Sequence, residues 1–128
     1  MTVAFQRTIP ILRIFSVEKA KEFCVDYPGF SVDWEHHFEE NTPAYLQVSR
    51  GWLTQHLSEH HGDACPGSTI FVWVTGIEEF HREIAGRNYR YLRPGLETTF
   101  YDAKCVQVID PFGNRIRFNE DLEPGNKA

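Results

Sequence analysis

Imidazole and carboxylate side chains, which often bind divalent metals, gather in one short stretch of the chain. The stretch contains His56, Glu59, His60, His61 and Asp63, and the pair His36 and His37 lies earlier in the sequence. It runs into a polar segment with Pro and Gly, where no helical register would hold the donors in a fixed arrangement. We therefore interpret it as a solvated connection, because exposed polar loops are the common case. A metal bound around His56, His60 and His61 stays an alternative.

Three cysteines could supply a nucleophile, but their placement does not favour one. Cys24, Cys65 and Cys105 are odd in number and far apart, which argues against a disulfide framework or a zinc ribbon. Cys24 falls on the apolar stripe of a predicted helix and Cys105 begins an apolar strand, so we expect both to be inert core thiols. No base can be assigned to Cys65. The sequence predicts no catalytic residue and a reduced, cytoplasmic protein.

The composition is that of one soluble domain. The chain has 128 residues, of which 41% are hydrophobic and 24% charged, and its formal net charge is −5. No Lys/Arg cluster offers a surface for nucleic acid, and no apolar run is long enough to span a membrane. The first ten residues do not resemble a signal peptide. Ten Phe, five Tyr and three Trp exceed what a core requires, so we expect some rings to line a pocket.

The chain repeats itself at an offset of 60 residues. Residues 12–18 align with residues 72–78, and residues 46–48 align with residues 106–108. Two separate matches at the same offset indicate a duplicated structural unit. The order of elements that must position any site is therefore predicted to occur twice.

Each unit is predicted to form a strand, a helix and three further strands. The first strands, residues 7–14 and 69–75, are apolar and β-branched. The helices follow Ser16 and Gly76, and their apolar residues recur at spacings of three and four. The remaining strands are predicted at residues 30–38, 44–49, 52–58, 89–92, 105–109 and 115–119. The single domain, residues 1–128, thus divides into a first half at 7–58, a connecting loop at 59–68, a second half at 69–120 and a tail at 121–128.

Four segments of the two units match the motifs of one superfamily. They are residues 12–23, the turn Pro28-Gly29-Phe30, residues 69–74, and the hairpin Asp110-Pro111-Phe112-Gly113-Asn114. They resemble the vicinal-oxygen-chelate superfamily, which comprises glyoxalases, bleomycin resistance proteins and dioxygenases, and residues 58–67 resemble the bleomycin-resistance branch. The resemblance implies an α+β fold in which two βαβββ repeats form a curved mixed sheet, and it implies a homodimer.

The resemblance also implies where a metal would lie. Catalytic members hold one divalent ion on the concave face of the sheet, and the four ligand positions correspond to Ile9, Thr69, Arg117 and His56 or a neighbour. A metal needs three or four donors that converge. Ile9 has no donor, Thr69 is a poor ligand, and Arg117 places a permanent positive charge where a carboxylate is needed. The sequence therefore predicts neither a metal nor a cofactor.

The same face is predicted to present rings. Side chains alternate along a strand, so the parity of Thr69 directs Phe71 and Trp73 to the concave face. The opposite parity places Ile70, Val72 and Val74, with Leu12 and Ile14 in the first half, under the helices.

Bleomycin resistance proteins hold a flat, cationic antibiotic in aromatic grooves at a dimer interface. By resemblance, the ring positions correspond to Trp34, Phe38, Phe71 and Tyr101, and the carboxylates that flank Trp34 would meet a cationic group. The predicted ligand-binding residues are Asp33, Trp34, Glu35, Phe38, Trp52, His56, Phe71, Trp73, Tyr101 and Arg117.

Three functions are compatible with this sequence. The first is a metal-free homodimer that sequesters a flat or cationic antibiotic or toxic compound, with no nucleic-acid or membrane partner. The second is a metal-dependent glyoxalase-like lyase or thiol transferase with a displaced metal site near His56. The third is a homodimer without a ligand. Function in a widely used fold depends on the residues of the site. We favour the first function, because the predicted site lacks metal ligands and presents aromatic rings.

Overall fold

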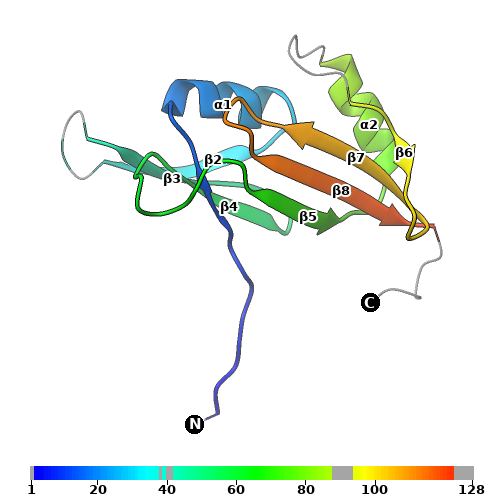
Figure 1. The fold of residues 1–128 in the computed structure, drawn as a ribbon, viewed down its shortest axis with the longest axis horizontal. Coiled ribbons are helices and arrows are strands. Elements are labelled where there is room, and N and C mark those ends of the chain that lie inside the picture. The colour runs from blue at the N-terminus through cyan, green and yellow to red at the C-terminus, as the bar shows by residue number, and fades with distance from the viewer. Residues whose placement is uncertain (1, 38, 40–41, 88–93, 123–128) are drawn as a thin grey trace.

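The computed structural model describes residues 2–37, 39, 42–87 and 94–122, and it contains two four-stranded mixed sheets side by side (Figure 1). The first half consists of β1 (Ile11–Arg13), α1 (Val17–Asp26), β2 (Ser31–His37), β3 (Ala44–Arg50) and β4 (Leu53–Ser58). The second half consists of β5 (Thr69–Trp73), α2 (Ile77–Gly86), β6 (Glu97–Thr98), β7 (Ala103–Ile109) and β8 (Arg115–Asp121). The predicted pair of βαβββ repeats is confirmed.

The two sheets share one strand order. The first has the order β1-β4-β3-β2 and the second β5-β8-β7-β6, and in each the first strand pairs in parallel with the last while the other pairs are antiparallel. Ile11 on β1 pairs with His56 on β4, and Phe71 on β5 pairs with Arg117 on β8. The internal repeat therefore extends to the register of the strands.

The two helices begin in different ways. Ser16 caps α1, since its hydroxyl accepts a hydrogen bond from the Lys19 amide at 3.2 Å. At α2 the cap residue is Gly76, whose φ of 86° is a conformation that favours glycine. The carboxylate of Glu120 on β8 accepts from the amides of Gly76 and Ile77 at 3.1 and 2.9 Å. A side chain of the last strand thus replaces the missing cap.

One core serves both halves. Leu12 and Ile14 are buried, and Ile70, Val72 and Val74 pack against the same cluster, as the strand parity predicts. Burial raises the pKa of the Cys24 thiol to about 12, in agreement with its prediction as an inert core residue.

Polar contacts also join the halves. Arg50, beside the β3–β4 turn, forms two hydrogen bonds with Glu83 of α2 at 2.7 and 3.0 Å. The guanidinium of Arg87 donates to the Tyr27 carbonyl at 2.7 Å, and the amide of Asn114 donates to the Arg13 carbonyl at 2.8 Å. These contacts fix the second half against the first.

Several predicted boundaries are corrected. The first strand covers only Ile11–Arg13, although the Pro10 carbonyl still accepts from the His56 amide at 2.9 Å; before this point the chain extends away toward the N-terminus (Figure 1). β4 begins at Leu53, since Gly51 and Trp52 form the turn, and β8 continues to Asp121. The strand predicted at 89–92 lies outside the described residues. Within the described part of the chain, no helix is long and apolar enough to cross a membrane.

Candidate functional site

The strand register divides each sheet into a core face and an open face. Residues directly opposite each other on paired strands share a face. Leu46 and Leu57 form one such pair and are buried, whereas the neighbouring pair, Gln47 and His56, lies on the other face and is partly exposed. We call the open face of the first sheet the N-face: Ile11, Asp33, Trp34, Tyr45, Gln47, Ser49 and His56. We call that of the second the C-face: Phe71, Trp73, Glu97, Tyr101, Cys105, Gln107, Arg117 and Asn119.

Three rings form a cluster on the N-face. The rings of Trp34 and Tyr45 are nearly parallel, with an interplanar angle of 12° and centroids 6.0 Å apart. The edge of His56 approaches both, with centroids 5.3 Å from Trp34 and 5.1 Å from Tyr45. Trp34 is 43% exposed, so its ring forms an apolar surface that a flat molecule can contact.

A chain of hydrogen bonds holds this cluster. The Gln47 side-chain amide donates from Nε2 to Asp33 at 3.0 Å, so its Oε1 is left to accept from His56 Nε2 at 3.0 Å. His56 Nδ1 then accepts from the Tyr45 hydroxyl at 2.7 Å. Burial lowers the pKa of His56, which favours the same neutral imidazole. Both ring nitrogens are engaged, so His56 has no lone pair free for a metal.

Asp33 places a carboxylate beside the ring cluster. The pairing of β2 with β3 is irregular between Val32 and Trp34, and the extra residue is Asp33. Its side chain therefore turns to the N-face, where it accepts from Gln47 and from the Ser49 hydroxyl, both at 3.0 Å. These two hydrogen bonds lower the pKa of Asp33, which keeps it ionised.

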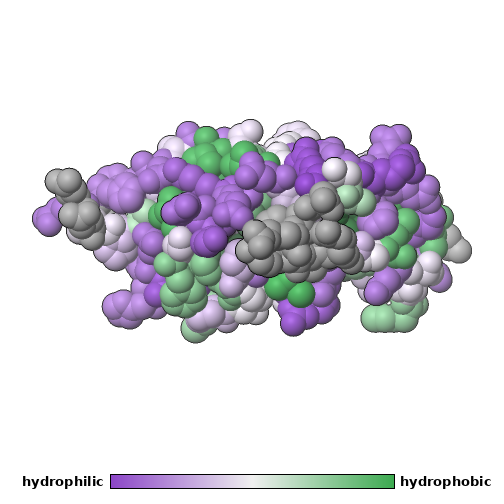
Figure 2. Space-filling model, turned by 90° about the horizontal axis from the view of Figure 1, so that it is seen from above, coloured by the Kyte–Doolittle hydropathy of each residue, from purple (hydrophilic) through white to green (hydrophobic). Residues whose placement is uncertain are grey.

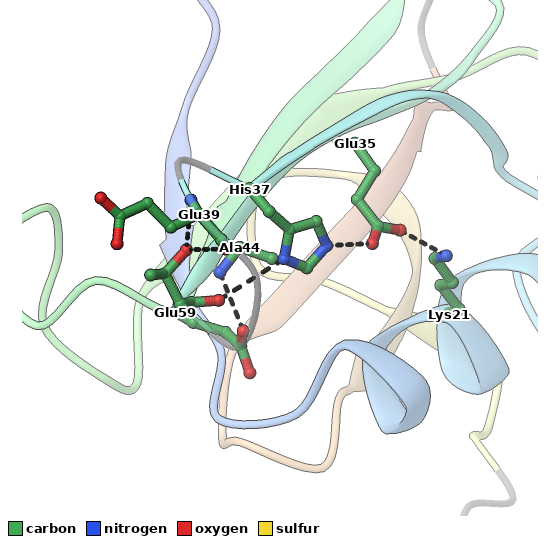
Figure 3. A network of polar contacts seen from close by, with 7 residues as sticks. Lys21, Glu35, His37, Glu39, Ala44 and Glu59 are labelled. Carbon is green, nitrogen blue, oxygen red and sulfur yellow. Dashed lines mark hydrogen bonds and ion pairs between the residues drawn. The ribbon is translucent and has the colours of Figure 1, made fainter.

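Glu35 does not share this face. It pairs with Leu46, whose side chain belongs to the core face, and it forms an ion pair with Lys21 of α1 (Figure 3). His37 Nε2 lies 2.5 Å from the second oxygen of Glu35. The hydrogen bonds from Lys21 and His37 lower the pKa of Glu35, and the bond to Glu35 raises the pKa of His37. The structure thus separates Glu35 from Trp34, while Phe38 lies outside the described residues.

Three rings also gather on the C-face, and strand parity predicted two of them there, Phe71 and Trp73. The centroid of Phe71 lies 4.9 Å from that of Trp73 and 5.9 Å from that of Tyr101. The hydroxyl of Tyr101 donates to the buried side chain of Asn119 at 2.6 Å, which fixes the ring. Phe71 and Trp73 are 46% and 45% exposed, respectively. These rings are not packed into the core, so they form a second open aromatic surface.

Arg117 lies next to Phe71 on the C-face. Its Nε donates to the side-chain oxygen of Gln107 at 2.8 Å. Arg117, Gln107, Tyr101 and Cys105 line a cavity of about 460 Å³. Cys105 was expected in the core, but it is only half-buried and borders this cavity. Burial raises the pKa of its thiol, so it is not an activated nucleophile.

A larger groove of about 1040 Å³ lies between the halves. It follows β5, including Phe71 and Trp73, and extends to Trp52 in the β3–β4 turn. Trp52 is 94% exposed. The groove therefore brings Trp52, predicted as a ligand contact, to the same opening as two residues of the C-face. Another side of the molecule, drawn in Figure 2, is mostly hydrophilic, and its apolar residues form small separate patches.

The residues present do not fit the metal that the superfamily implies. His56 pairs with Ile11, and Arg117 pairs with Phe71, so neither first strand offers a donor beside these positions. Glu59 accepts from the Ala44 amide at 2.9 Å and Asp63 from the Ser58 hydroxyl at 2.6 Å, so the candidate loop uses its carboxylates internally. Among the described residues, no three His, Cys, Asp or Glu side chains converge as metal ligands.

Tyr45, Gln47, Gln107 and Asn119 are site residues that sequence reasoning did not select. A signal for the two glutamines was present, because both lie at the centre of a repeated segment, flanked by apolar residues whose side chains must face the core. The alternation along β3 would also have directed Tyr45 to the N-face. Asn119 carried no comparable signal.

A family model described as glyoxalase superfamily protein matches residues 1–125. No curated protein sequence matches the chain. A bleomycin-binding protein from Streptomyces verticillus, solved with copper(II)-bleomycin, shows a TM-score of 0.70 and 25% identity, and the match covers 95% of this chain and 100% of that one.

Two further solved structures are similar. A bleomycin-binding protein in complex with bleomycin matches with a TM-score of 0.71 and 16% identity over 91% of this chain and 99% of that one. A glyoxalase-related enzyme from Clostridium phytofermentans matches with a TM-score of 0.73 and 15% identity over 94% and 98%. The family match spans nearly the whole chain, and the solved structures share its fold. The chain therefore belongs to the glyoxalase superfamily.

Proposed function

We propose that this protein binds a flat, cationic small molecule, such as a bleomycin-like antibiotic or another toxic compound, and sequesters it without chemical conversion. The observation that carries the proposal is the N-face, where Trp34 is stacked on Tyr45 beside the ionised Asp33. Aromatic faces attract flat heterocycles and cations, and the carboxylate adds complementary charge. The solved bleomycin-binding proteins of the same fold support this choice of ligand.

The proposal includes a homodimer. The large apolar side chains Val3, Phe5, Trp52 and Phe100 are at least 87% exposed, an arrangement that a second copy would cover. β5 pairs only with β8, so its other edge is a further surface on which two chains could meet. In a dimer, the N-face and C-face would become walls of grooves rather than open surfaces.

The proposal also specifies a metal-free, cytoplasmic protein with no nucleic-acid or membrane partner. Its support is the donor set: both nitrogens of His56 are engaged, and Arg117 opposes a cation. The described cysteines Cys24, Cys65 and Cys105 are unpaired, which suits a reducing compartment. The net charge of −5 does not favour binding to nucleic acid or anionic lipid.

Calorimetry with metal-free and copper-loaded bleomycin tests the proposal. We expect micromolar or tighter binding, reduced about tenfold in Trp34→Ala and by a similar factor in Phe71→Ala, since a stacked ring contributes about 1 kcal/mol or more. Trp34→Phe is the matched control, because it keeps a ring at this position and should lose less. Elemental analysis of the purified protein should find no stoichiometric transition metal. One equivalent of metal per chain, or unchanged affinity in both alanine variants, would contradict the proposal.

A further inference from the structure

The guanidinium of Arg117 is positioned but only partly used. Gln107 accepts a hydrogen bond from Nε at 2.8 Å, which fixes the plane of the group. Among the described residues, no hydrogen bond or ion pair engages its two terminal nitrogens. Since a guanidinium carries five N–H donors in a rigid fork and only the one on Nε is used, the four donors of the terminal nitrogens remain available.

The surroundings of this fork favour a flat molecule. Phe71 is the direct neighbour of Arg117 across β5 and β8, and the Tyr101 ring next to Phe71 is fixed by its hydrogen bond to Asn119. Arg117 and Tyr101 line the same cavity of about 460 Å³, which is large enough for a small aromatic compound. Phe71 borders the larger groove instead, so a flat molecule held by Arg117 in the cavity would reach Phe71 at its edge, across the β5–β8 pair.

The charges of the cavity select the group that the fork would bind. Arg117 is the one cation among the described lining residues, and Glu97 is the one anion. Glu97 and Arg117 are not within ion-pair distance of each other in the described structure, so the guanidinium is not neutralised. A ligand with one negative charge is therefore favoured at Arg117, whereas a second negative charge on the ligand would be repelled by Glu97. The net charge of −5 gives no long-range attraction for anions, so local contacts must hold the group.

We propose that the C-face binds the carboxylate of a flat aromatic molecule, with the carboxylate on the terminal nitrogens of Arg117 and the ring on Phe71 and Tyr101. The fork of an arginine matches the two oxygens of a carboxylate and can form two parallel hydrogen bonds. This inference rests on the proposed function and extends it: the guest has an anionic end for the C-face as well as a cationic end for the N-face. No bond is made or broken.

Binding of 2-naphthoate and its neutral analogue 2-naphthamide to the purified protein tests the inference. Calorimetry on the full chain should show naphthoate bound at least tenfold more tightly than naphthamide, because charge-assisted hydrogen bonds are the strong ones. Arg117→Gln should abolish this preference. Arg117→Lys keeps the charge but loses the planar fork, so it should retain only part of the preference. Arg82→Gln is the matched control: it removes the same charge from α2, where Arg82 belongs neither to the C-face nor to the lining of the cavity, and it should keep the preference.

Each result is decisive. Equal affinity for the two probes, no binding of naphthoate, or equal losses in Arg117→Gln and Arg82→Gln would overturn the carboxylate site. Bleomycin binding by the same preparations separates this inference from the proposed function. If bleomycin binds and naphthoate does not, only the carboxylate site is wrong. If naphthoate binds through Arg117 and bleomycin does not, the carboxylate site is supported and the choice of ligand in the proposed function is wrong.

Discussion

The N-face and the C-face have one backbone plan and different chemistry. Gln47 and Gln107 occupy equivalent positions on β3 and β7, and each accepts a hydrogen bond from the residue opposite it on the last strand of its sheet. That residue is His56 in the first half and Arg117 in the second. A glutamine thus fixes the central side chain of each face, but the two faces differ in what remains free.

The difference shows how a duplicated unit can acquire two binding properties. On the N-face, Tyr45 and Gln47 occupy both nitrogens of a neutral imidazole, and the carboxylate of Asp33 lies beside the rings. Arg13 shares this face by register, but its guanidinium donates to the carbonyls of Ile14 and Glu59. On the C-face, one guanidinium nitrogen is occupied and the positive charge stays accessible. We therefore expect the N-face to favour cationic groups and the C-face to favour anionic ones, although aromatic rings border both.

Reversing the charge on the C-face should have the largest effect. In Arg117→Glu, naphthoate would meet two carboxylates, Glu97 and the new one, and its affinity should fall about 100-fold or more. The variant should bind 2-naphthylmethylammonium more tightly than the wild type, because the C-face then resembles the N-face in charge. Calorimetry with both probes measures this, with Arg82→Glu on α2 as the control. A variant that still binds naphthoate would break the comparison.

Removing one hydroxyl from each face should give a smaller effect, mainly on stability. Tyr101→Phe leaves the buried side chain of Asn119 without its donor, and we expect a loss of about 1 kcal/mol in the free energy of unfolding. Tyr45→Phe removes the donor to His56 Nδ1, which stabilises the neutral imidazole. Its distinguishing result is therefore a raised pKa of His56, measured by NMR titration. An unchanged pKa would mean that the hydrogen-bond chain on the N-face does not set the protonation of His56.

Removing the charge of Asp33 should weaken binding at the N-face by about threefold, since the carboxylate is exposed and partly screened by salt. Asp33→Asn should bind 2-naphthylmethylammonium less tightly and with less dependence on salt, while naphthoate binding stays the same. Asp26→Asn removes the same charge from α1 and should change neither. An equal loss for both probes would indicate a general loss of structure instead of a local charge effect.

The smallest expected effect is a difference between the faces in how the free energy of unfolding depends on pH. Burial lowers the pKa of His56, so its contribution to stability is complete above the ordinary histidine pKa and is lost as the pH falls through the lowered value. We expect His56→Gln to lose less stability than the wild type between about pH 7 and pH 5, measured by denaturant unfolding.

The effect of pH on His37 has the opposite sign, because its raised pKa stabilises the fold at acidic pH and that contribution is lost as the pH rises.

The repeat could be predicted from the sequence because the apolar residues of both halves recur in the same order and spacing. The offset of 60 and strand parity placed Phe71 and Trp73 on an open face and Val72 under a helix, since a core imposes its alternation on every strand. Strand parity alone would place Asp33 and Glu35 together on the face opposite Trp34. An irregular pairing of β2 with β3 moves Asp33 beside Trp34, and Lys21 of α1 holds Glu35 on the other face. Neither the irregularity nor the partner from another element leaves a local signal in the sequence.

The hydrogen-bond chain could not be predicted for a different reason. His56 was selected as the only potential metal ligand of its set, but its role depends on Tyr45 and Gln47, which approach it across the β3–β4 pair. The short extent of β1 was also missed, since residues 7–14 are apolar and β-branched throughout much of their length. Composition therefore overestimated the strand, and only the pairing partners set its limits.

The most direct measurement is an NMR titration of the three tryptophan indole N–H signals with 2-naphthylmethylammonium and with 2-naphthoate. Trp34 belongs to the N-face and Trp73 to the C-face, so one spectrum reports on both. The cationic probe should shift the Trp34 signal and the anionic probe the Trp73 signal, each with saturation. If both probes shift the same indole, or if neither shifts Trp34 or Trp73, the two faces do not bind flat guests according to charge.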